Sequence, residues 1–308
     1  MKKISVLIPC YNEEENAAGI CQAVLEQLAK LESYDYEIIF IDNNSTDKTR
    51  VIIEDVCKNN KKVKAIFNAK NFGQFSSPYY GLMQSSGDCV IPICADFQDP
   101  VEMIPVFVKE WESGYKIVAA TKKKSKTNPL VHFFRGIYYK FMKKHSDYQL
   151  IEQFTGFALY DKSFIDVLRN LDEPQPFIRG IVAELGADIK EVPYVQAKRR
   201  AGKTKNNFGT LYDAAMLSVT AYTKFPVRLI MFLGVFFGFL GFCGGIACLI
   251  LDLLNIWKNS AALIFCIVMF FAGFQLVSTA AVGEYILTLT KRSKKRPLVV
   301  EERRINFD

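Results

Sequence analysis

Short apolar runs that alternate with amphipathic stretches fill the first hundred residues and constrain the fold more than any other feature. The runs at residues 4–8, 37–41, 63–67 and 89–94 have the length of strands that are buried on both faces. The stretches between them, such as residues 13–31, have the apolar spacing of helices. This alternation predicts an α/β domain with a Rossmann-like, mostly parallel sheet and helices on both of its faces.

A polar cluster follows each predicted strand. After the fourth strand come Asp96, Gln98 and Asp99. Ligands of open α/β sheets bind beyond the carboxyl ends of the strands, so these side chains are expected at a binding edge. Their oxygens suit Mg²⁺ or Mn²⁺, which usually also binds substrate phosphates. Alternatively, Asp96 and Asp99 only cap a helix whose first turn contains Pro100. The earlier clusters occupy residues 10–16, 42–47 and 68–74.

Several common site types are disfavoured. The chain has no GxGxxG, GxxxxGK[ST] or GxSxG pattern, which argues against a dinucleotide site, a P-loop and a hydrolase elbow. Its two histidines, His132 and His145, argue against a histidine-centred triad or metal site. The eight cysteines show no paired spacing and are interpreted as reduced, mostly buried thiols.

Two long apolar segments indicate a membrane protein. Residues 229–254 contain one charge, Asp252, and residues 260–283 contain none. Each segment exceeds the roughly 20 residues that cross a hydrocarbon core as a helix. A buried helical hairpin in a large soluble core is the alternative. The first run is too short for a signal peptide, so the N-terminal part is expected in the cytosol.

Both flanks of the apolar pair are basic within a chain of net charge +7. Residues 198–228 contain a single acid, Asp213, and residues 291–296 read KRSKKR. The positive-inside rule therefore places both termini in the cytoplasm. Anionic headgroups or a lipid phosphate explain these charges better than nucleic acid does, because the charges bracket two predicted spans.

An ordered set of motifs resembles family 2 glycosyltransferases with a GT-A fold. The motifs are VLIPCYNEE at residues 6–14, IDNNSTDKT at 41–49, NFG at 71–73, ADFQDP at 95–100, RRAGKTK at 199–205 and GEY at 283–285. The resemblance covers nearly the whole chain and is closest to the polyprenyl-phosphate branch, which includes bactoprenol glucosyltransferases and dolichyl-phosphate mannose synthases.

The resemblance implies a multi-pass protein of the bacterial cytoplasmic membrane, with its catalytic domain and both termini in the cytosol. A GT-A domain would be followed by a two-helix transmembrane hairpin, and a homo-oligomer is possible. The expected parts are the domain at residues 1–205, an amphipathic juxtamembrane segment at 206–228, the hairpin at 229–283 and a basic tail at 284–308.

The implied activity is that of a metal-dependent hexosyltransferase. It would transfer a sugar from a nucleotide sugar, with UDP-glucose as the expected example, to polyprenyl phosphate with inversion. Two alternatives are a GDP-mannose-using enzyme like dolichyl-phosphate mannose synthase and a non-catalytic membrane scaffold. A processive polysaccharide synthase is disfavoured, because the chain has no QxxRW motif.

The resemblance also assigns roles to residues. Asp96 and Gln98 would hold Mg²⁺ or Mn²⁺, with Asp96, Asp99 and Arg199 as catalytic groups. The basic loop at residues 199–205 could close over a diphosphate or could instead anchor the chain on headgroups. Lys122 and Arg135 flank an aromatic stretch and could reach the acceptor phosphate, or they could be plain surface charge. The expected donor-binding residues are Pro9, Tyr11, Glu13, Asp42, Arg200, Lys203 and Lys205.

Some positions depart from the family pattern. Cys94 replaces the first aspartate of the metal motif, and Asn43 replaces an aspartate in the donor motif. Gly156 and Ala158 stand where relatives often have the aspartate and arginine of GDFRL, so no catalytic base can be carried over. For an anionic phosphate acceptor, positioning and charge stabilisation are expected to suffice without a base. Glu152, Gln153 and Thr155 are unranked substitutes.

Overall fold

The structure is a computed structural model. It describes residues 1–123, 150–171, 173–174, 176–201 and 297–307, together with scattered positions between 136 and 289. The strands are β1 (Lys2–Cys10), β2 (Tyr34–Asp42), β3 (Val63–Asn68), β4 (Cys89–Pro92), β5 (Ile117–Lys122), β6 (Phe154–Asp161), β7 (Ile189–Tyr194) and β8 (Glu301–Ile305). The helices are α1 (Ala17–Leu28), α2 (Thr49–Asn59), α3 (Gly73–Met83), α4 (Met103–Glu112), α6 (Lys162–Asn170) and α7 (Ile178–Leu185).

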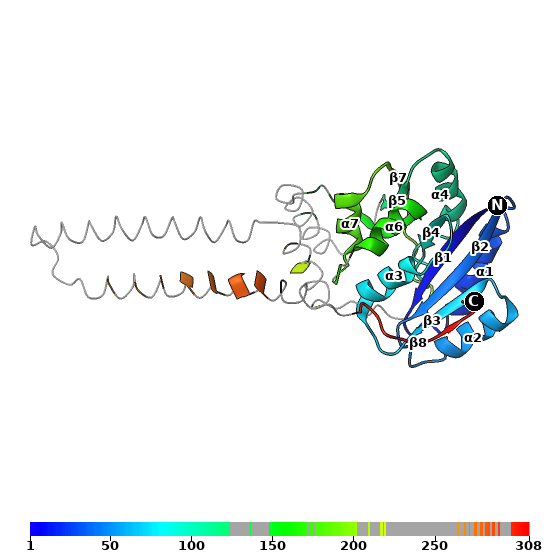
Figure 1. The fold of residues 1–308 in the computed structure, drawn as a ribbon, viewed down its shortest axis with the longest axis horizontal. Helices are drawn as coiled ribbons and strands as arrows, with labels where there is room; N and C mark the ends of the chain where they lie inside the picture. Colours follow the sequence, from blue (N-terminus) through cyan, green and yellow to red (C-terminus); the bar gives the residue numbers. More distant parts are fainter. Residues whose placement is uncertain are drawn as a thin grey trace, which may run out of the picture.

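These strands form one mixed sheet in the order β7-β5-β6-β4-β1-β2-β3-β8 (Figure 1). β1 pairs in parallel with β2 and β4, and β2 pairs in parallel with β3. β6 runs antiparallel between β4 and β5, and β8 runs antiparallel along β3. The predicted strands and the mostly parallel α/β sheet are therefore confirmed.

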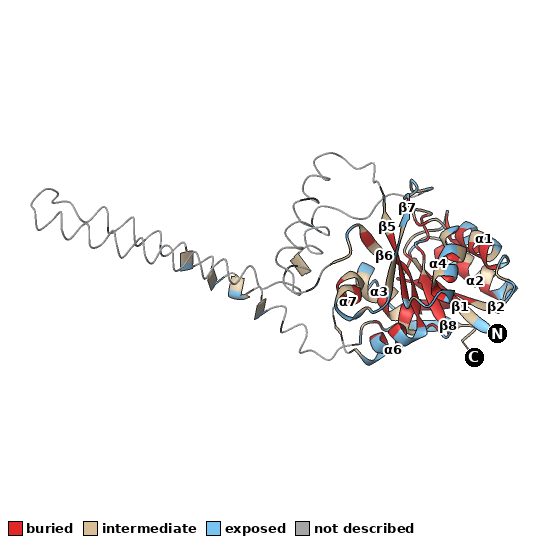
Figure 2. Ribbon diagram, turned by 90° about the horizontal axis from the view of Figure 1, so that it is seen from above, coloured by how far each residue is buried: buried red, intermediate tan, exposed pale blue. Residues whose placement is uncertain are grey.

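Helices cover both faces of the sheet, as the alternation predicted. One apolar core packs α1, α2 and α4 against one face, and a second packs α3, α6 and α7 against the other. The central strands are almost fully buried between these layers (Figure 2). This burial explains their uninterrupted apolar runs, since a strand covered on both faces has no solvent side for polar residues.

One predicted helix start, and one alternative that involved a helix start, were wrong. The first helix begins at Ala17 and not at residue 13, because the backbone amides of Glu13 and Glu14 donate to Thr49 and Asp47 in a loop. The helix after β4 begins at Met103 and not at Pro100, and neither Asp96 nor Asp99 caps it. The capping alternative is therefore wrong.

The predicted membrane segments lie largely outside the described residues. This applies to all of 229–254, to most of 206–228 and to 260–283 apart from separated positions. Within the part of the chain that the structure describes, no helix combines the length and the apolar character needed to cross a bilayer.

A buried carboxylate, Glu37, holds the sheet together at the edge opposite the polar clusters. It is 1% exposed and accepts hydrogen bonds from Ser5 Oγ (2.6 Å) and Ser86 N (2.7 Å). Lys64 Nζ lies 2.8 Å and Lys3 Nζ 3.2 Å from its Oε2 atom. Burial raises the pKa of Glu37, but the hydrogen bonds from Lys64 and Ser5 and the charge of Lys3 outweigh it and lower the pKa from 4.5 to about 2.

Replacing Glu37 by glutamine is expected to destabilise the domain by about 2–3 kcal/mol at pH 7. Because the folded-state pKa is lowered, the ionised carboxylate stabilises the fold fully above pH 4.5 and progressively less as the pH falls towards about 2. Thermal unfolding should show a melting temperature about 5–10 °C lower at pH 7 and a smaller difference at pH 3. Glu26→Gln on the exposed face of α1 is the control. An equal loss at both pH values would contradict the electrostatic account.

Candidate active site

The loops that follow β1 and β2 are bound together at the carboxyl edge of the sheet. Asn12 N donates to Ser45 Oγ (2.8 Å), and Asn12 Oδ1 accepts from Thr46 N (2.7 Å). Asn12 and Asn44 both have positive φ angles, of 54° and 64°. Asparagine tolerates this left-handed conformation better than most residues. The polar clusters after the first two strands therefore meet, as expected.

Asp42 is fully buried beneath these loops. Its carboxylate accepts from Ser45 N through both oxygens (3.2 and 3.1 Å) and from Arg50 Nε (2.7 Å). The contact with Ser45 is a local turn in which the aspartate side chain accepts from a backbone amide a few residues on. Asp42 does not line the pocket described below, whereas its neighbour Asn43 does.

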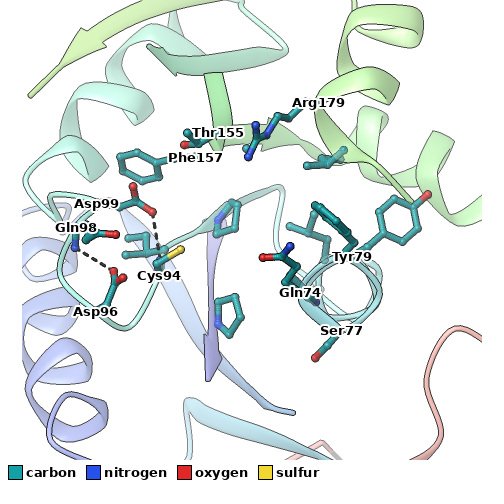
Figure 3. A pocket seen from close by; sticks show the side chains of 18 of the residues that line it. Gln74, Ser77, Tyr79, Cys94, Asp96, Gln98, Asp99, Thr155, Phe157 and Arg179 are labelled. Atoms are coloured by element: carbon teal, nitrogen blue, oxygen red, sulfur yellow. Dashed lines mark hydrogen bonds between the residues drawn. The ribbon is translucent and has the colours of Figure 1, made fainter. Parts of the chain in front are cut away.

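A three-residue ion-pair cluster links the first and fourth strand ends to the basic loop. Arg199 donates from Nε to Asp96 Oδ2 (3.1 Å), and its Nη2 lies 3.0 Å from the same oxygen and 3.4 Å from Glu13 Oε1. The other Asp96 oxygen, Oδ1, accepts from Gln98 N (3.1 Å; Figure 3). Arg200 stacks over the Phe97 ring at 5.0 Å. The predicted grouping of Glu13, Asp96 and the basic loop is thus present.

Asp99 forms a second acidic position on the pocket wall. It is 7% exposed, and it accepts from Cys94 N (3.4 Å) and from the Tyr194 hydroxyl (3.3 Å). Burial and the nearby charge of Asp96 raise the pKa of Asp99. The hydrogen bonds from Cys94 lower it but do not outweigh these two effects. Burial and Asp99 also raise the pKa of Tyr194, so its phenol keeps the proton that it donates. Tyr194 was not predicted from the sequence.

Asp96, Gln98 and Asp99 border one pocket of about 400 Å³ at the sheet edge (Figure 3), whereas Glu13, Arg199 and Tyr194 do not line it. Pro9 and Tyr11, two of the expected donor-binding residues, and Lys122, an expected acceptor-phosphate residue, line it. Its acidic side is formed by Asp96, Gln98 and Asp99, whereas an opposite, mainly apolar side comes from α3 and the start of α7. The apolar side includes Phe75, Pro78, Leu82, Phe177 and Ile178, with the Phe75 and Phe177 rings packed edge to face at 6.0 Å.

Arg179, in the first turn of α7, also lines the pocket and was missed by the sequence analysis. Its guanidinium lies 5.8 Å from the Phe177 ring centroid and points towards Thr155 (Figure 3). No carboxylate among the described residues forms an ion pair with it. The only sequence signal was an arginine two positions after a phenylalanine, which is too common a pattern to select it.

Gly156 and Ala158, which stand where relatives often have the aspartate and arginine of GDFRL, have structural roles in this chain. Gly156 has a φ of 99°, and a Cβ atom there would lie 3.2 Å from Ile178 Cγ2, so a side chain is disfavoured. Ala158 is fully buried in the sheet core. Among the three unranked substitutes, Thr155 lines the pocket, and Glu152 and Gln153 do not.

The donor groups of the acidic side suit a cation whose coordination is completed by substrate. The described residues contain no cluster of three or more His, Cys, Asp or Glu side chains that could hold a metal. Desolvation and the charges of Asp99 and Asp96 raise the pKa of the Cys94 thiol well above its ordinary value. Mg²⁺ and Mn²⁺ prefer oxygen ligands to thiols, so Cys94 is a poor substitute for the missing aspartate. Asp96 and the Gln98 amide remain as the candidate metal ligands. Mg²⁺ is commonly bound by one or two carboxylates plus substrate phosphates, so this set fits.

Three predicted site residues, Arg135, Lys203 and Lys205, lie outside the described residues.

Comparison with known proteins identifies the family. Residues 5–169 match the model of glycosyl transferase family 2. The chain belongs to this family. It is 32% identical over 305 residues to the prophage bactoprenol glucosyl transferase homolog of Escherichia coli K12, covering 98% of this chain and 99% of that protein. It is also 32% identical over 299 residues to the bactoprenol glucosyl transferase of Shigella phage SfV, covering 96% of each.

Solved structures with a similar fold were also found. Glucosyl-3-phosphoglycerate synthase from Mycobacterium tuberculosis, in complex with Mn²⁺, UDP and glucosyl-3-phosphoglycerate, matches 71% of this chain and 78% of its own with a TM-score of 0.48 and 16% identity. As a family 2 member, the chain is a glycosyltransferase, and its sheet is the mostly parallel α/β sheet of the GT-A fold.

Proposed function

We propose that this glycosyltransferase transfers a sugar from a nucleotide sugar to a polyprenyl phosphate at a membrane surface. The observation that carries the proposal is a single pocket with two sides. One side is acidic, and the other is apolar and aromatic and includes the guanidinium of Arg179. The acidic side suits a nucleoside diphosphate with its divalent metal, and the apolar side suits the first isoprene units of the acceptor. Relatives named as bactoprenol glucosyl transferases, matched over nearly their whole length, support the same acceptor class.

In this reaction an oxygen of the acceptor phosphate forms a bond to the anomeric carbon, and the bond from that carbon to the donor diphosphate breaks with inversion. The acceptor oxygen is already anionic near neutral pH, so the reaction needs no residue to remove a proton, consistent with Gly156 and Ala158. A divalent ion on Asp96 and Gln98, Mg²⁺ or Mn²⁺, would offset charge on the departing diphosphate. Arg199 would add a second positive charge there.

The two points between which residues 202–296 are connected support a membrane-facing site. Ala201 lies beside the site, since its carbonyl accepts from Asn16 Nδ2 (3.5 Å). The chain resumes near the carboxyl end of β3, where Val300 O accepts from Ala69 N (2.9 Å). Both ends of residues 202–296 thus lie at the site edge, as an even number of membrane crossings requires. We therefore propose the hairpin at 229–254 and 260–283.

Exposed apolar side chains also support this hairpin. Ile264, Val268 and Val282 are each 57% exposed and lie at positions described as helical. Contact with lipid would bury such side chains, and a bilayer needs no polar stripe on the helix. The polyprenyl acceptor would then be presented beside the pocket, in the cytoplasmic membrane of a bacterium.

A transfer assay with the purified full chain tests the function. The protein in detergent is incubated with undecaprenyl phosphate, Mn²⁺ or Mg²⁺ and radiolabelled UDP-glucose, other UDP-sugars or GDP-mannose. We expect a chloroform-soluble labelled product with a UDP-sugar and loss of that product with EDTA. Product with GDP-mannose alone would favour the mannose synthase alternative. No product with any donor would contradict the proposal and favour the scaffold.

Arg179→Ala is expected to raise the KM for undecaprenyl phosphate about tenfold while changing the affinity for UDP less than twofold. A charge-assisted hydrogen bond to phosphate contributes about 1.5–3 kcal/mol, and half-burial reduces that contribution. Arg179→Lys should recover part of the loss, and Arg169→Gln on α6 serves as the remote control. A rise confined to the donor KM would instead assign Arg179 to the diphosphate.

A further inference from the structure

The last strand of the sheet comes from the C-terminal end of the chain, outside the segment that matches the family model. β8 pairs antiparallel with β3, joining Ala65 to Ile305 and Phe67 to Arg303, with an irregularity between Phe67 and Asn68. The sequence EERRI is charged and half exposed, so apolar burial alone does not account for its place in the sheet. Ion pairs to α2 supply specific contacts.

One of these contacts reaches the donor side of the site through Arg50. Arg50 Nε donates to Asp42 (2.7 Å), Nη1 donates to Glu302 Oε2 (2.8 Å) and Nη2 donates to Asn68 O (2.8 Å). The guanidinium also packs over the Phe67 ring at 5.5 Å. A planar guanidinium with three acceptors has one orientation that satisfies them all, so Glu302 helps to fix the group that holds Asp42.

A second chain of hydrogen bonds runs from the same strand ends to the pocket wall. Asn68 Nδ2 donates to Asn43 Oδ1 (3.1 Å), which also accepts from Phe72 N (2.9 Å). Asn43 Nδ2 donates in turn to Asn71 Oδ1 (2.9 Å) and Gly73 O (3.2 Å). Asn43 and Gly73 line the pocket. Arg50 therefore touches both Asp42 and the residue that begins this network.

We propose that β8 is a functional part of the donor site, and that Glu302 and Arg50 are positioning residues for Asp42 and the Asn43 loop. The proposal rests on the proposed function, in which this side of the site binds a nucleoside diphosphate. It gives the C-terminal end of the chain a role in donor affinity beyond closing the sheet.

A neighbouring ion pair of the same two elements provides a matched control. Arg303 of β8 pairs with Glu54 of α2, one turn along the helix from Arg50, but makes no contact with Asp42 or Asn68. Glu302→Gln and Arg303→Gln therefore each remove one ion pair between β8 and α2. Arg303 also packs over the Phe67 ring at 4.5 Å, but of the two residues only Glu302 bonds directly to the group that holds Asp42.

The test measures binding of UDP and of GDP with Mn²⁺ to the full chain in detergent by calorimetry, together with melting temperature. Glu302→Gln is expected to raise the Kd of the bound nucleotide about three- to fivefold, as expected for a partly exposed ion pair. Arg303→Gln should change it less than 1.5-fold, although both should lower the melting temperature alike. The Kd of the Arg50→Lys variant should equal or exceed that of the Glu302→Gln variant, because one ammonium group cannot satisfy all three acceptors.

Equal Kd changes in Glu302→Gln and Arg303→Gln would overturn the proposal, because β8 would then act through general stability. An unchanged Kd in Glu302→Gln, with a clear rise in Asp42→Asn, would overturn the link to β8 and leave the donor site in place. Failure of the wild-type protein to bind either nucleotide would overturn the donor site itself, and the role of β8 with it.

Discussion

Asp96→Asn is expected to lower kcat/KM for sugar transfer about a thousandfold, which corresponds to about 4 kcal/mol of transition-state stabilisation. Asp96 is the pocket carboxylate that becomes available to a divalent cation once a donor displaces Arg199, whereas Asp99 is hydrogen-bonded to Cys94 N and to the Tyr194 hydroxyl. Asparagine keeps the shape and can still accept from Gln98 N, but it removes the negative charge that holds the cation.

The measurement is initial rates of lipid-linked product with Mn²⁺ varied over several orders of magnitude. Raised Mn²⁺ should recover only part of the activity of Asp96→Asn. Asp35→Asn is the control, since it removes an exposed carboxylate that pairs with Lys62 far along the sheet. Turnover of Asp96→Asn near the wild-type rate, with an unchanged melting temperature, would refute the metal assignment.

Much of the fold is predictable from the sequence where the signal is local. The apolar runs of β1 to β4 are buried on both faces, so each run alone indicates a strand, and the polar residue after each run marks the binding edge. The antiparallel insertion of β6 between β4 and β5 depends on pairing between distant segments. β8 was not predicted because its charged sequence has no apolar alternation, and its place is fixed by pairing with β3 and by ion pairs.

The residues of the candidate site also divide into those that the sequence predicts and those that only the folded packing brings to the site. Asp96, Asp99 and Arg199 were predicted, and the structure brings Arg199 to Asp96 across about a hundred residues of sequence. Asp42 was placed at the correct edge, but Arg50 and Ser45 hold it below the pocket wall. Tyr194 and Arg179 could not be found, because only the packing of β7 and α7 brings Tyr194 to Asp99 and Arg179 to the pocket.

Arg199→Ala is expected to reduce kcat/KM about a hundred- to thousandfold, mainly through kcat, for a reason that follows from its present partners. Arg199 lies between Asp96 and Glu13, with a quarter of its side chain exposed. It neutralises two carboxylates that would otherwise repel an incoming diphosphate. A diphosphate carries more negative charge than either carboxylate, so the guanidinium can transfer to it as the donor and its cation bind to Asp96.

Charge on the diphosphate grows as the sugar departs, so a guanidinium placed there stabilises the transition state more than the bound donor. Arg199→Lys should recover part of kcat, because lysine supplies the charge without the planar fork. Lys198→Ala removes an exposed charge one residue away in the same loop and should change kcat less than twofold. If Arg199→Ala raises only the donor KM, Arg199 merely screens Asp96 and Glu13, and the diphosphate leaves without its help.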